Sequence, residues 1–176
     1  MDVRKALEKR RAIKRFDAAL ELSDSELQQL LEPVLLTPTS YNLQHYRFIV
    51  ARERALKAKL CEASYNQLQV RDCSAVVVIV SKLNAHEDAG KIYGHLPEEI
   101  TAKLVSMTQS FYGKSPQLQR DEAMRSGSLA AMTLMLVASE MDLETCPMIG
   151  YNEPKVIELL NIPENCAVVM MICVGK

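Results

Sequence analysis

The stretch from Asp121 to Met141 constrains the fold most, because it reads as one helix that is apolar on every side. Asp121 and Glu122 stand at its start, where acidic side chains favour the positive end of the helix dipole. Two sides of the helix then carry apolar or small residues at helical spacing: Leu129, Met132 and Leu136 on one, and Gly127, Ala131 and Ala138 on the other. A helix with this pattern must be covered on all sides.

This helix is expected to be the buried axis of a soluble protein. Its apolar part, Leu129 to Ala138, is shorter than the roughly 20 residues that a membrane-spanning helix needs. The side with small residues would allow a second helix to approach closely. We hypothesise that a second subunit forms part of the covering, although an ordinary core helix is the simpler interpretation.

The composition indicates one domain and gives no reason to expect nucleic acid or a membrane as partner. A chain of 176 residues can bury a sizeable core. Its 21 Lys and Arg nearly balance its 22 Asp and Glu, which leaves a net charge of −1. The five cysteines form no Cys-x-x-Cys pair, which favours free thiols in a reducing compartment over a disulfide framework. The charged N-terminus lacks the apolar run of a signal peptide, so a cytoplasmic location is expected.

Two unbroken apolar runs, Ala75–Val80 and Ala167–Val174, predict strands that are covered on both faces. Shorter strands are expected at Arg47–Val50 and within Thr145–Tyr151. About six or seven helices are expected, and they do not alternate strictly with the strands. The pattern therefore predicts an α+β fold with three layers, in which helices cover both faces of a small mixed, mostly antiparallel sheet.

Other segments give weaker signals. Ser23 and Glu26 form a capping box, and Pro33 predicts a kink or an early end of the helix that they begin. A helix that starts at Pro97 should carry four apolar residues on one face: Ile100, Leu104, Met107 and Phe111. The stretch Lys82–Gly94 has no clear pattern and is expected to be a mobile surface segment. Its histidines and acidic residues match no recognised metal-site spacing, so no metal is expected.

Two polar stretches could carry chemistry. The basic cluster within Lys9–Arg15 is either a solvated turn or an anion site, because arginine can hold a phosphate through two parallel hydrogen bonds. The polar loop Thr37–Tyr46 is either a plain connection or a site for a polar ring or sugar. No common nucleotide-binding, hydrolase or metalloprotease motif occurs in the sequence, so an enzyme of this kind would rely on a cofactor.

Five stretches resemble motifs of the nitroreductase family of flavin enzymes, in the family's order. They are Arg10–Asp17, Thr37–Tyr46, Tyr65–Gln67, Ser128–Ala138 and Thr145–Tyr151. The second is similar to the family's Ala-Pro-Ser-x-x-Asn-x-Gln-Pro-Trp segment. No single motif is specific, but five in order with compatible spacing cover nearly the whole chain. Residues 1–176 are therefore expected to form a single nitroreductase-like, flavin-binding domain.

The resemblance implies an FMN at a homodimer interface, held at its anionic end by the N-terminal basic cluster. Arg10, Arg11 and the backbone of Ala12 would meet the phosphate and the ribityl chain. Lys14 would lie near N1 and O2 of the flavin ring. A positive charge there would stabilise the anionic reduced flavin.

The other implied contacts come from three separate segments. The partner subunit would contribute three residues of the polar loop: Thr39, Ser40 and Asn42. Asn66 would hydrogen-bond the edge of the flavin ring, and the backbone of Ile149 and Gly150 would approach N5. No side chain would need to act as a nucleophile or a base.

The implied reaction is a ping-pong transfer of hydride from NADH or NADPH, through flavin N5, to a nitroaromatic, a quinone or a related small-molecule electron acceptor. An alternative hypothesis is a flavin-binding carrier or redox sensor without significant turnover. A purely structural module built on the central helix is a third, and it leaves the polar loops without a role.

The chain departs from the family pattern at three places. Ala12 stands where the family usually has Ser, which removes one hydroxyl from the implied phosphate site. His45 and Tyr46 replace Pro-Trp, a change expected to alter packing rather than chemistry. The sequence stops at Lys176, where family members continue into a C-terminal arm that wraps the partner subunit. Either the chain has been cut short, or FMN is held with fewer cations in a weaker dimer.

Overall fold

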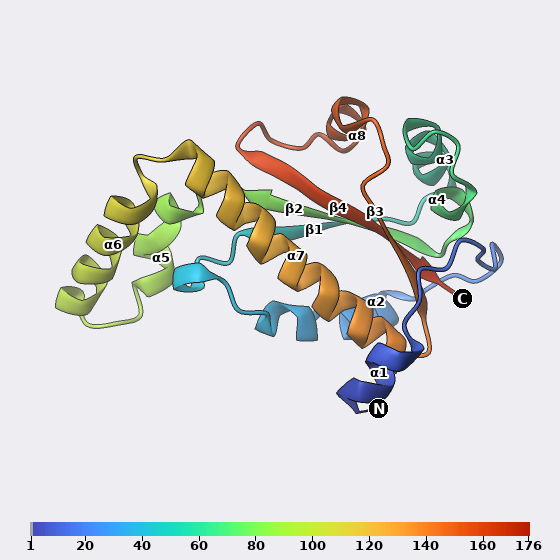
Figure 1. The fold of residues 1–176 in the computed structure, drawn as a ribbon, viewed down its shortest axis with the longest axis horizontal. Helices are drawn as coiled ribbons and strands as arrows, with labels where there is room; N and C mark the ends of the chain where they lie inside the picture. Colours follow the sequence, from blue (N-terminus) through green and yellow to red (C-terminus); the bar gives the residue numbers. More distant parts are fainter. Residues whose placement is uncertain (1) are drawn as a thin grey trace.

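A four-stranded sheet in the order β1-β2-β4-β3 lies at the centre of the computed structural model, which describes residues 2–176 (Figure 1). Its strands are β1 (Tyr46–Ala51), β2 (Ala75–Lys82), β3 (Glu144–Met148) and β4 (Cys166–Gly175). All three pairings between these strands are antiparallel, and Ala12 adds an isolated parallel bridge to Thr145. The prediction of a small, mostly antiparallel sheet in an α+β fold is confirmed.

Helices cover both faces of this sheet, so the two faces pack into separate cores. On β2, Val77 and Ile79 belong to one core, whereas Val76 and Val78 belong to the other. This division follows from the alternation of side chains along a strand. Every residue from Ala75 to Ser81 is buried, which explains why β2 reads as an unbroken apolar run.

The first helical layer contains α1, α2, the short 3₁₀ helix η1 and α7. Their bounds are Val3–Lys9, Asp24–Leu31, Pro33–Leu36 and Pro116–Glu140. The predicted capping box is confirmed, since the Ser23 side chain accepts from the Glu26 amide and the Glu26 carboxylate accepts from the Ser23 amide. The helix ends before Pro33, as predicted.

The small-residue side of α7 packs on the sheet rather than on a second helix. A Cβ built on Gly127 would lie 2.5 Å from Cγ2 of Val169 and 2.7 Å from Oγ of Ser81. Val169 lies on β4 and Ser81 on β2, so the expectation of a second helix at this side is wrong. Leu129, on another side of α7, is 50% exposed in the single chain.

The second helical layer contains α3 (Arg54–Ala63), α4 (Leu68–Asp72) and α8 (Glu153–Leu160). These helices lie on the face of the sheet opposite α7 (Figure 1). Asn152 begins α8 as its N-cap, because its side chain accepts from the Lys155 amide. The three-layer arrangement is therefore present as predicted.

A third unit, with its own small core, stands at one end of the molecule (Figure 1). It contains the 3₁₀ helices η2 (Ser40–Asn42) and η3 (Ala85–Asp88) and the helices α5 (Ala89–Tyr93) and α6 (Glu98–Tyr112). Its core is formed by five buried residues: Leu43, Ala85, Ala89, Tyr93 and Tyr112.

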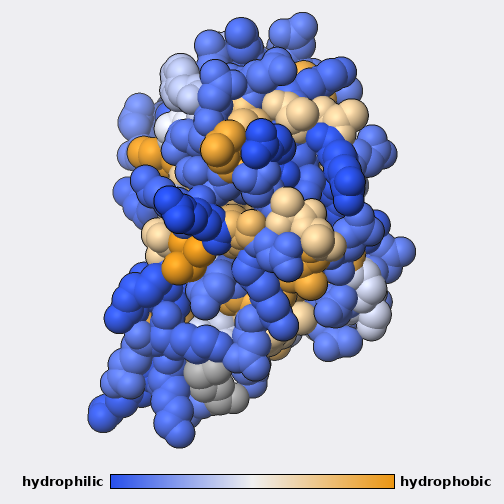
Figure 2. Space-filling view, turned by 90° about the vertical axis from the view of Figure 1, so that its right-hand side faces the viewer, coloured by the Kyte–Doolittle hydropathy of each residue, from blue (hydrophilic) through white to orange (hydrophobic). Residues whose placement is uncertain are grey.

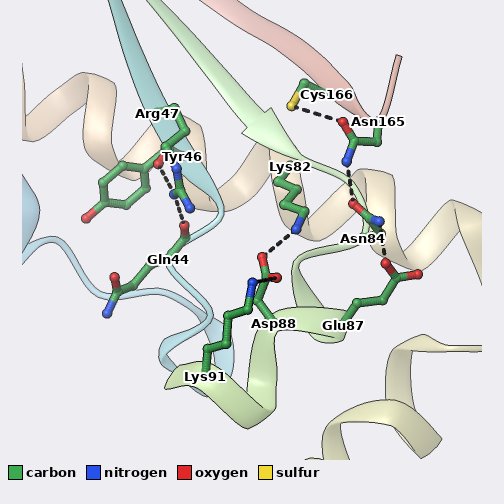
Figure 3. A network of polar contacts seen from close by, with 10 residues as sticks. All are labelled: Gln44, Tyr46, Arg47, Lys82, Asn84, Glu87, Asp88, Lys91, Asn165 and Cys166. Carbon is green, nitrogen blue, oxygen red and sulfur yellow. Dashed lines mark hydrogen bonds and ion pairs between the residues drawn. The ribbon is translucent and has the colours of Figure 1, made fainter. Parts of the chain in front are cut away.

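The expectation of a patternless surface segment at Lys82–Gly94 is wrong, because this stretch forms η3 and α5 and contributes to that core. Polar contacts fix it to the sheet (Figure 3). Lys82 at the end of β2 pairs with Asp88, and Asn165 just before β4 donates to Asn84 over 3.1 Å. Two of the four buried residues here, Ala85 and Ala89, are alanines, whose small side chains give a weak periodic signal.

The predicted apolar face of α6 is largely uncovered in the single chain. Ile100, Met107 and Phe111 are 48%, 45% and 52% exposed. The buried residues of this helix are instead Thr108 and Tyr112. Three apolar side chains of this helix therefore remain accessible in the single chain.

Candidate functional site

The basic segment after α1 runs beside β3 in the parallel direction. Ala12 forms the bridge to Thr145, and the amide of Ile13 donates to the carbonyl oxygen of Thr145 over 2.9 Å. Because the two segments are parallel, Lys14 is directed toward the C-terminal end of β3 and Arg10 toward its start. If the segment stays extended, Arg10 and Lys14 lie roughly 13 Å apart along the chain.

The cations of this segment are available to a ligand. Within residues 2–176, the side chains of Arg10 and Lys14 form no hydrogen bond or ion pair, whereas the neighbouring Lys9 pairs with Asp142. Arg11 donates from Nη1 to the carbonyl oxygen of Arg10 over 2.8 Å. Burial raises the pKa of the Cys146 thiol on β3, and the charge of Lys14 opposes that effect. Lys14 therefore lies close to β3.

A turn between α3 and α4 meets the loop after β3. Tyr65 and Asn66 have φ values of 56° and 57°, a left-handed conformation that turns the chain sharply. Gln67 then donates from Nε2 to the carbonyl oxygen of Gly150 over 2.7 Å. Ile149 is 77% exposed. Asn66 and Gly150 are therefore brought to the same place.

Seven of the ten predicted site residues thus gather along β3, which we call the β3 patch: Arg10, Arg11, Ala12, Lys14, Asn66, Ile149 and Gly150. This side of the molecule is the right-hand side of Figure 1, which Figure 2 views directly. Figure 2 shows hydrophobic surface there next to strongly hydrophilic groups. A cavity of about 310 Å³ near Lys57 contains none of the predicted residues.

The other three predicted residues, Thr39, Ser40 and Asn42, form a second group, which we call the loop patch. Asn42 is exposed, while Thr39 Oγ1 accepts from the amide of Gln44 over 2.9 Å. Ser40 Oγ lies 2.5 Å from the hydroxyl of Tyr112. Three residues here have positive φ: Tyr41 at 52°, Asn42 at 50° and Gln44 at 48°. A left-handed tyrosine is uncommon, and such strain often accompanies a function.

The two patches lie at opposite corners of the sheet. Tyr46, which follows the loop patch, pairs with Ser81, and Ser81 pairs with Ala167 near the start of β4. Thr145, beside Ala12, pairs with Val174 near the end of β4. Three strand spacings across and seven residues along separate Tyr46 from Thr145 by a distance on the order of 25–30 Å. One copy of the chain does not bring the two patches together.

Two residues with evident roles in these patches were not predicted. Gln67, which follows Asn66 directly, bonds to Gly150, which lies 83 residues further along the chain. Tyr112 contacts Ser40 from 72 residues away. No local motif could have revealed either pair. On α6, Leu104 and Val105 also pack against the core that contains Tyr112, and Thr108 lies one turn before Tyr112.

Among residues 2–176, no group of three or more His, Cys, Asp or Glu side chains is placed to hold a metal ion. In the same part of the chain, no helix is both long enough and apolar enough to cross a membrane.

Comparisons with known proteins identify the family. Residues 7–176 match the model of the nitroreductase family. Protein DrgA of Synechocystis sp. is 38% identical over 177 residues, which cover 100% of this chain and 84% of DrgA. MhqN of Bacillus subtilis, which bears the name NAD(P)H nitroreductase, is 36% identical, with coverage of 95% of this chain and 84% of MhqN.

A solved structure agrees with these sequence matches. An Exiguobacterium sibiricum protein crystallised in complex with FMN superposes with a TM-score of 0.91 at 30% identity, covering 100% of this chain and 88% of that protein. The family inferred from the sequence motifs is confirmed: this chain belongs to the nitroreductase family.

Proposed function

We propose that this protein is an FMN-dependent oxidoreductase that transfers hydride from NADH or NADPH to a nitroaromatic, a quinone or a related acceptor by a ping-pong mechanism. The name of MhqN supports the nucleotide, and the FMN in the Exiguobacterium protein supports the cofactor. When bound, FMN would supply the ring that accepts and then donates the hydride.

One observation carries the proposal: Arg10 and Lys14 are unpaired cations, within residues 2–176, at the two ends of an extended segment beside β3. Exposed amide groups of Asn66 and Gly150 lie toward the Lys14 end. This arrangement matches a ligand with an anionic tail at one end, beside Arg10, and a polar ring at the other, beside the amide groups. The residues present therefore fit FMN.

Each residue of the β3 patch then has a physical task. Arg10 and Arg11 would bind the phosphate, with the backbone of Ala12 beside the ribityl chain. Ala12 adds no hydroxyl, so the guanidinium groups would carry most of this binding. Lys14 would hold a positive charge where negative charge develops in the reaction, and a fixed charge of this kind lowers the barrier without further rearrangement.

We infer that the loop patch completes the site from a second copy of the chain. Thr39, Ser40 and Asn42 are too far from the β3 patch to reach the same FMN within one copy. A twofold dimer brings the same pair of surfaces together twice, so two equivalent sites would form. The exposed Leu129 on α7 supports an interface between copies.

A groove beside the loop patch suggests the kind of acceptor. It has a volume of about 420 Å³ and is lined by Tyr41, Ser106, Met107, Ser110 and Phe111. The rings of Tyr41 and Phe111 have centroids 5.9 Å apart, and the lining carries no charged side chain. Such a lining suits a flat, neutral ring, which fits a quinone or a nitroaromatic compound.

Stopped-flow spectroscopy tests the proposal. The purified protein is loaded with FMN, mixed without oxygen with NADH or NADPH, and then mixed with candidate acceptors. The absorbance of the oxidised flavin should fall within the first step and return in the second. A protein that does not bind FMN contradicts the proposal as a whole.

The same experiment separates the enzyme from a carrier or redox sensor. Bound FMN that stays oxidised in excess nucleotide contradicts the enzyme and favours a flavin carrier. We propose the cytoplasm as its location, where the five free cysteines would remain reduced.

A further inference from the structure

The hydrogen bond between Tyr112 and Ser40 joins the α6 helix to the loop patch. Tyr112 is 2% exposed, and its hydroxyl oxygen lies 2.5 Å from Ser40 Oγ. Among residues 2–176, this contact is the only hydrogen bond of the Tyr112 hydroxyl. Its ring is fixed on several sides, with His45 at 6.4 Å and His86 at 6.2 Å between ring centroids.

The direction of this hydrogen bond follows from burial. If Ser40 were the donor, the phenolic proton of Tyr112 would be buried without an acceptor, which is costly. Burial also raises the pKa of Tyr112, so the phenol keeps its proton. Tyr112 is therefore the donor and Ser40 Oγ the acceptor. The proton of Ser40 is then free to point away from Tyr112.

The loop has a second support from the same unit. The hydroxyl of Tyr93 on α5 donates to the carbonyl oxygen of Tyr41. Tyr41 has a φ of 52°, which tyrosine rarely adopts without such support. The two tyrosines hold different parts of the same loop. Tyr93 bonds the main chain at Tyr41 and Tyr112 bonds the side chain of Ser40, so each contact restrains the loop.

We propose that Tyr112 is a positioning residue that fixes Ser40 as a hydrogen-bond donor toward the ligand. This inference rests on the proposed function, in which Ser40 contacts FMN. The flavin ring and the phosphate both offer acceptor atoms, so a serine oriented as a donor binds them without first reorienting. Tyr112 thus contributes to cofactor affinity from behind the serine and touches neither FMN nor the acceptor.

The test compares Tyr112→Phe with Tyr46→Phe. Both variants keep the ring and remove one buried hydroxyl, and the Tyr46 hydroxyl donates to the carbonyl oxygens of Val34 and Thr37 over 3.1 Å. Tyr112→Phe should weaken FMN binding about tenfold, measured by titration of flavin fluorescence. Tyr46→Phe should lower the melting temperature to a similar extent without changing FMN affinity. Equal loss of FMN affinity in both variants overturns the inference.

A double-mutant cycle with Ser40→Ala tests whether Tyr112 acts by positioning Ser40 or by a general effect on the stability of the loop. If Tyr112 acts through Ser40, the double variant should bind FMN as weakly as Ser40→Ala alone and no more weakly. If the fold losses of FMN affinity from the two substitutions multiply, Tyr112 acts independently of Ser40 and the inference is overturned.

Amide hydrogen exchange in the flavin-free protein keeps this test distinct from the proposed function. Residues 39–44 should exchange at least several times faster in Tyr112→Phe than in wild type or Tyr46→Phe. If wild type binds no FMN, the proposed function fails, while the exchange rates still report on the loop. Unchanged exchange in Tyr112→Phe contradicts the inference even if FMN binds.

Discussion

The side-chain amide of Gln67 donates a 2.7 Å hydrogen bond to the main-chain carbonyl of Gly150, and this contact fixes the turn before α4 against the loop after β3. Gln69 reinforces it by donating to Gln67 Oε1 over 3.0 Å. The glutamine is thus held at both ends of its amide. Asn66 and Gly150 keep their relative positions because of this connection.

Replacing Gln67 with alanine should therefore weaken FMN binding by about five- to tenfold, since one positioning hydrogen bond is worth about 1 kcal/mol. A fluorescence titration measures this effect. Gln29→Ala is the matched control, because in the described part of the chain the Gln29 side chain bonds only to the nearby Ser25, on the exposed side of α2. FMN affinity that is the same in both variants would contradict this role of Gln67.

Removing the charge of Lys14 should slow the reaction more than it weakens binding. In Lys14→Met the reduced flavin loses a nearby positive charge, so its midpoint potential should become more negative and its reduction by NADH or NADPH should slow at least tenfold. Lys14→Arg, which keeps the charge, should retain most of the rate. Arg54→Met serves as the control for loss of an exposed cation, since Arg54 lies on α3 and pairs only loosely with Glu21. Spectroelectrochemistry and stopped-flow reduction measure the two effects.

A charge placed on the exposed side of α7 should separate the proposed dimer. Leu129 is 50% exposed in the single chain, and Leu129→Glu would put a carboxylate into an apolar interface. Sedimentation velocity should show a shift toward monomer and a loss of bound FMN. Leu68→Glu, at a 52% exposed position on α4, should leave the sedimentation coefficient unchanged. A wild-type protein that sediments as a monomer would refute the shared site.

Gly127→Ala should destabilise the fold. The added Cβ would lie within 3 Å of both Val169 and Ser81, so helix α7 or the sheet must shift. Overpacking of this kind costs about 1–3 kcal/mol, which lowers the melting temperature by several degrees. Gly90→Ala is the control, because a Cβ at Gly90 meets nothing within 4 Å. Calorimetry measures both melting temperatures, and a Gly127→Ala variant as stable as Gly90→Ala would contradict this prediction.

His45 should make stability depend on pH below neutrality. It is 2% exposed, its Nδ1 has no hydrogen-bond partner among residues 2–176, and burial lowers its pKa. The charge of Glu122 opposes this shift, while His86 and Arg47 reinforce it. The unfolded chain therefore takes up this proton first, near pH 6.5, and stability falls as the pH drops from there toward the lower pKa of the folded state.

His45→Gln removes this titration, so the free energy of unfolding should fall less as the pH drops below neutrality. Urea midpoints measured between pH 7.5 and 5 should fall more steeply in wild type than in the variant. Parallel curves would show that other groups set the acid sensitivity.

The parts of the fold that the sequence reveals depend on local patterns. Ala75–Val80 and Ala167–Val174 are strands because β-branched and apolar side chains are needed where both faces are covered. The start of α2 is visible because Ser23 and Glu26 bond to each other's backbone. These signals involve residues that are neighbours in the chain.

The parts that the sequence does not reveal depend on distant pairs. The packing of the segment after Lys82 requires Asn165, and the environment of Gly127 is set by Val169. In the site, family motifs indicated Arg10, Lys14 and Asn66. Gln67 lies in the family-like stretch Tyr65–Gln67, but its role became apparent only from its contact with the distant Gly150, as that of Tyr112 did from Ser40.

The separation of the β3 patch and the loop patch has a consequence for mixtures of damaged proteins. Suppose that one polypeptide carries Arg10→Ala and another carries Ser40→Ala, and that they pair at random. In the proposed dimer, each hybrid pair would then have one centre with both defects and one centre with none. Intersubunit complementation would follow, so two alleles that are each inactive could restore activity when expressed together.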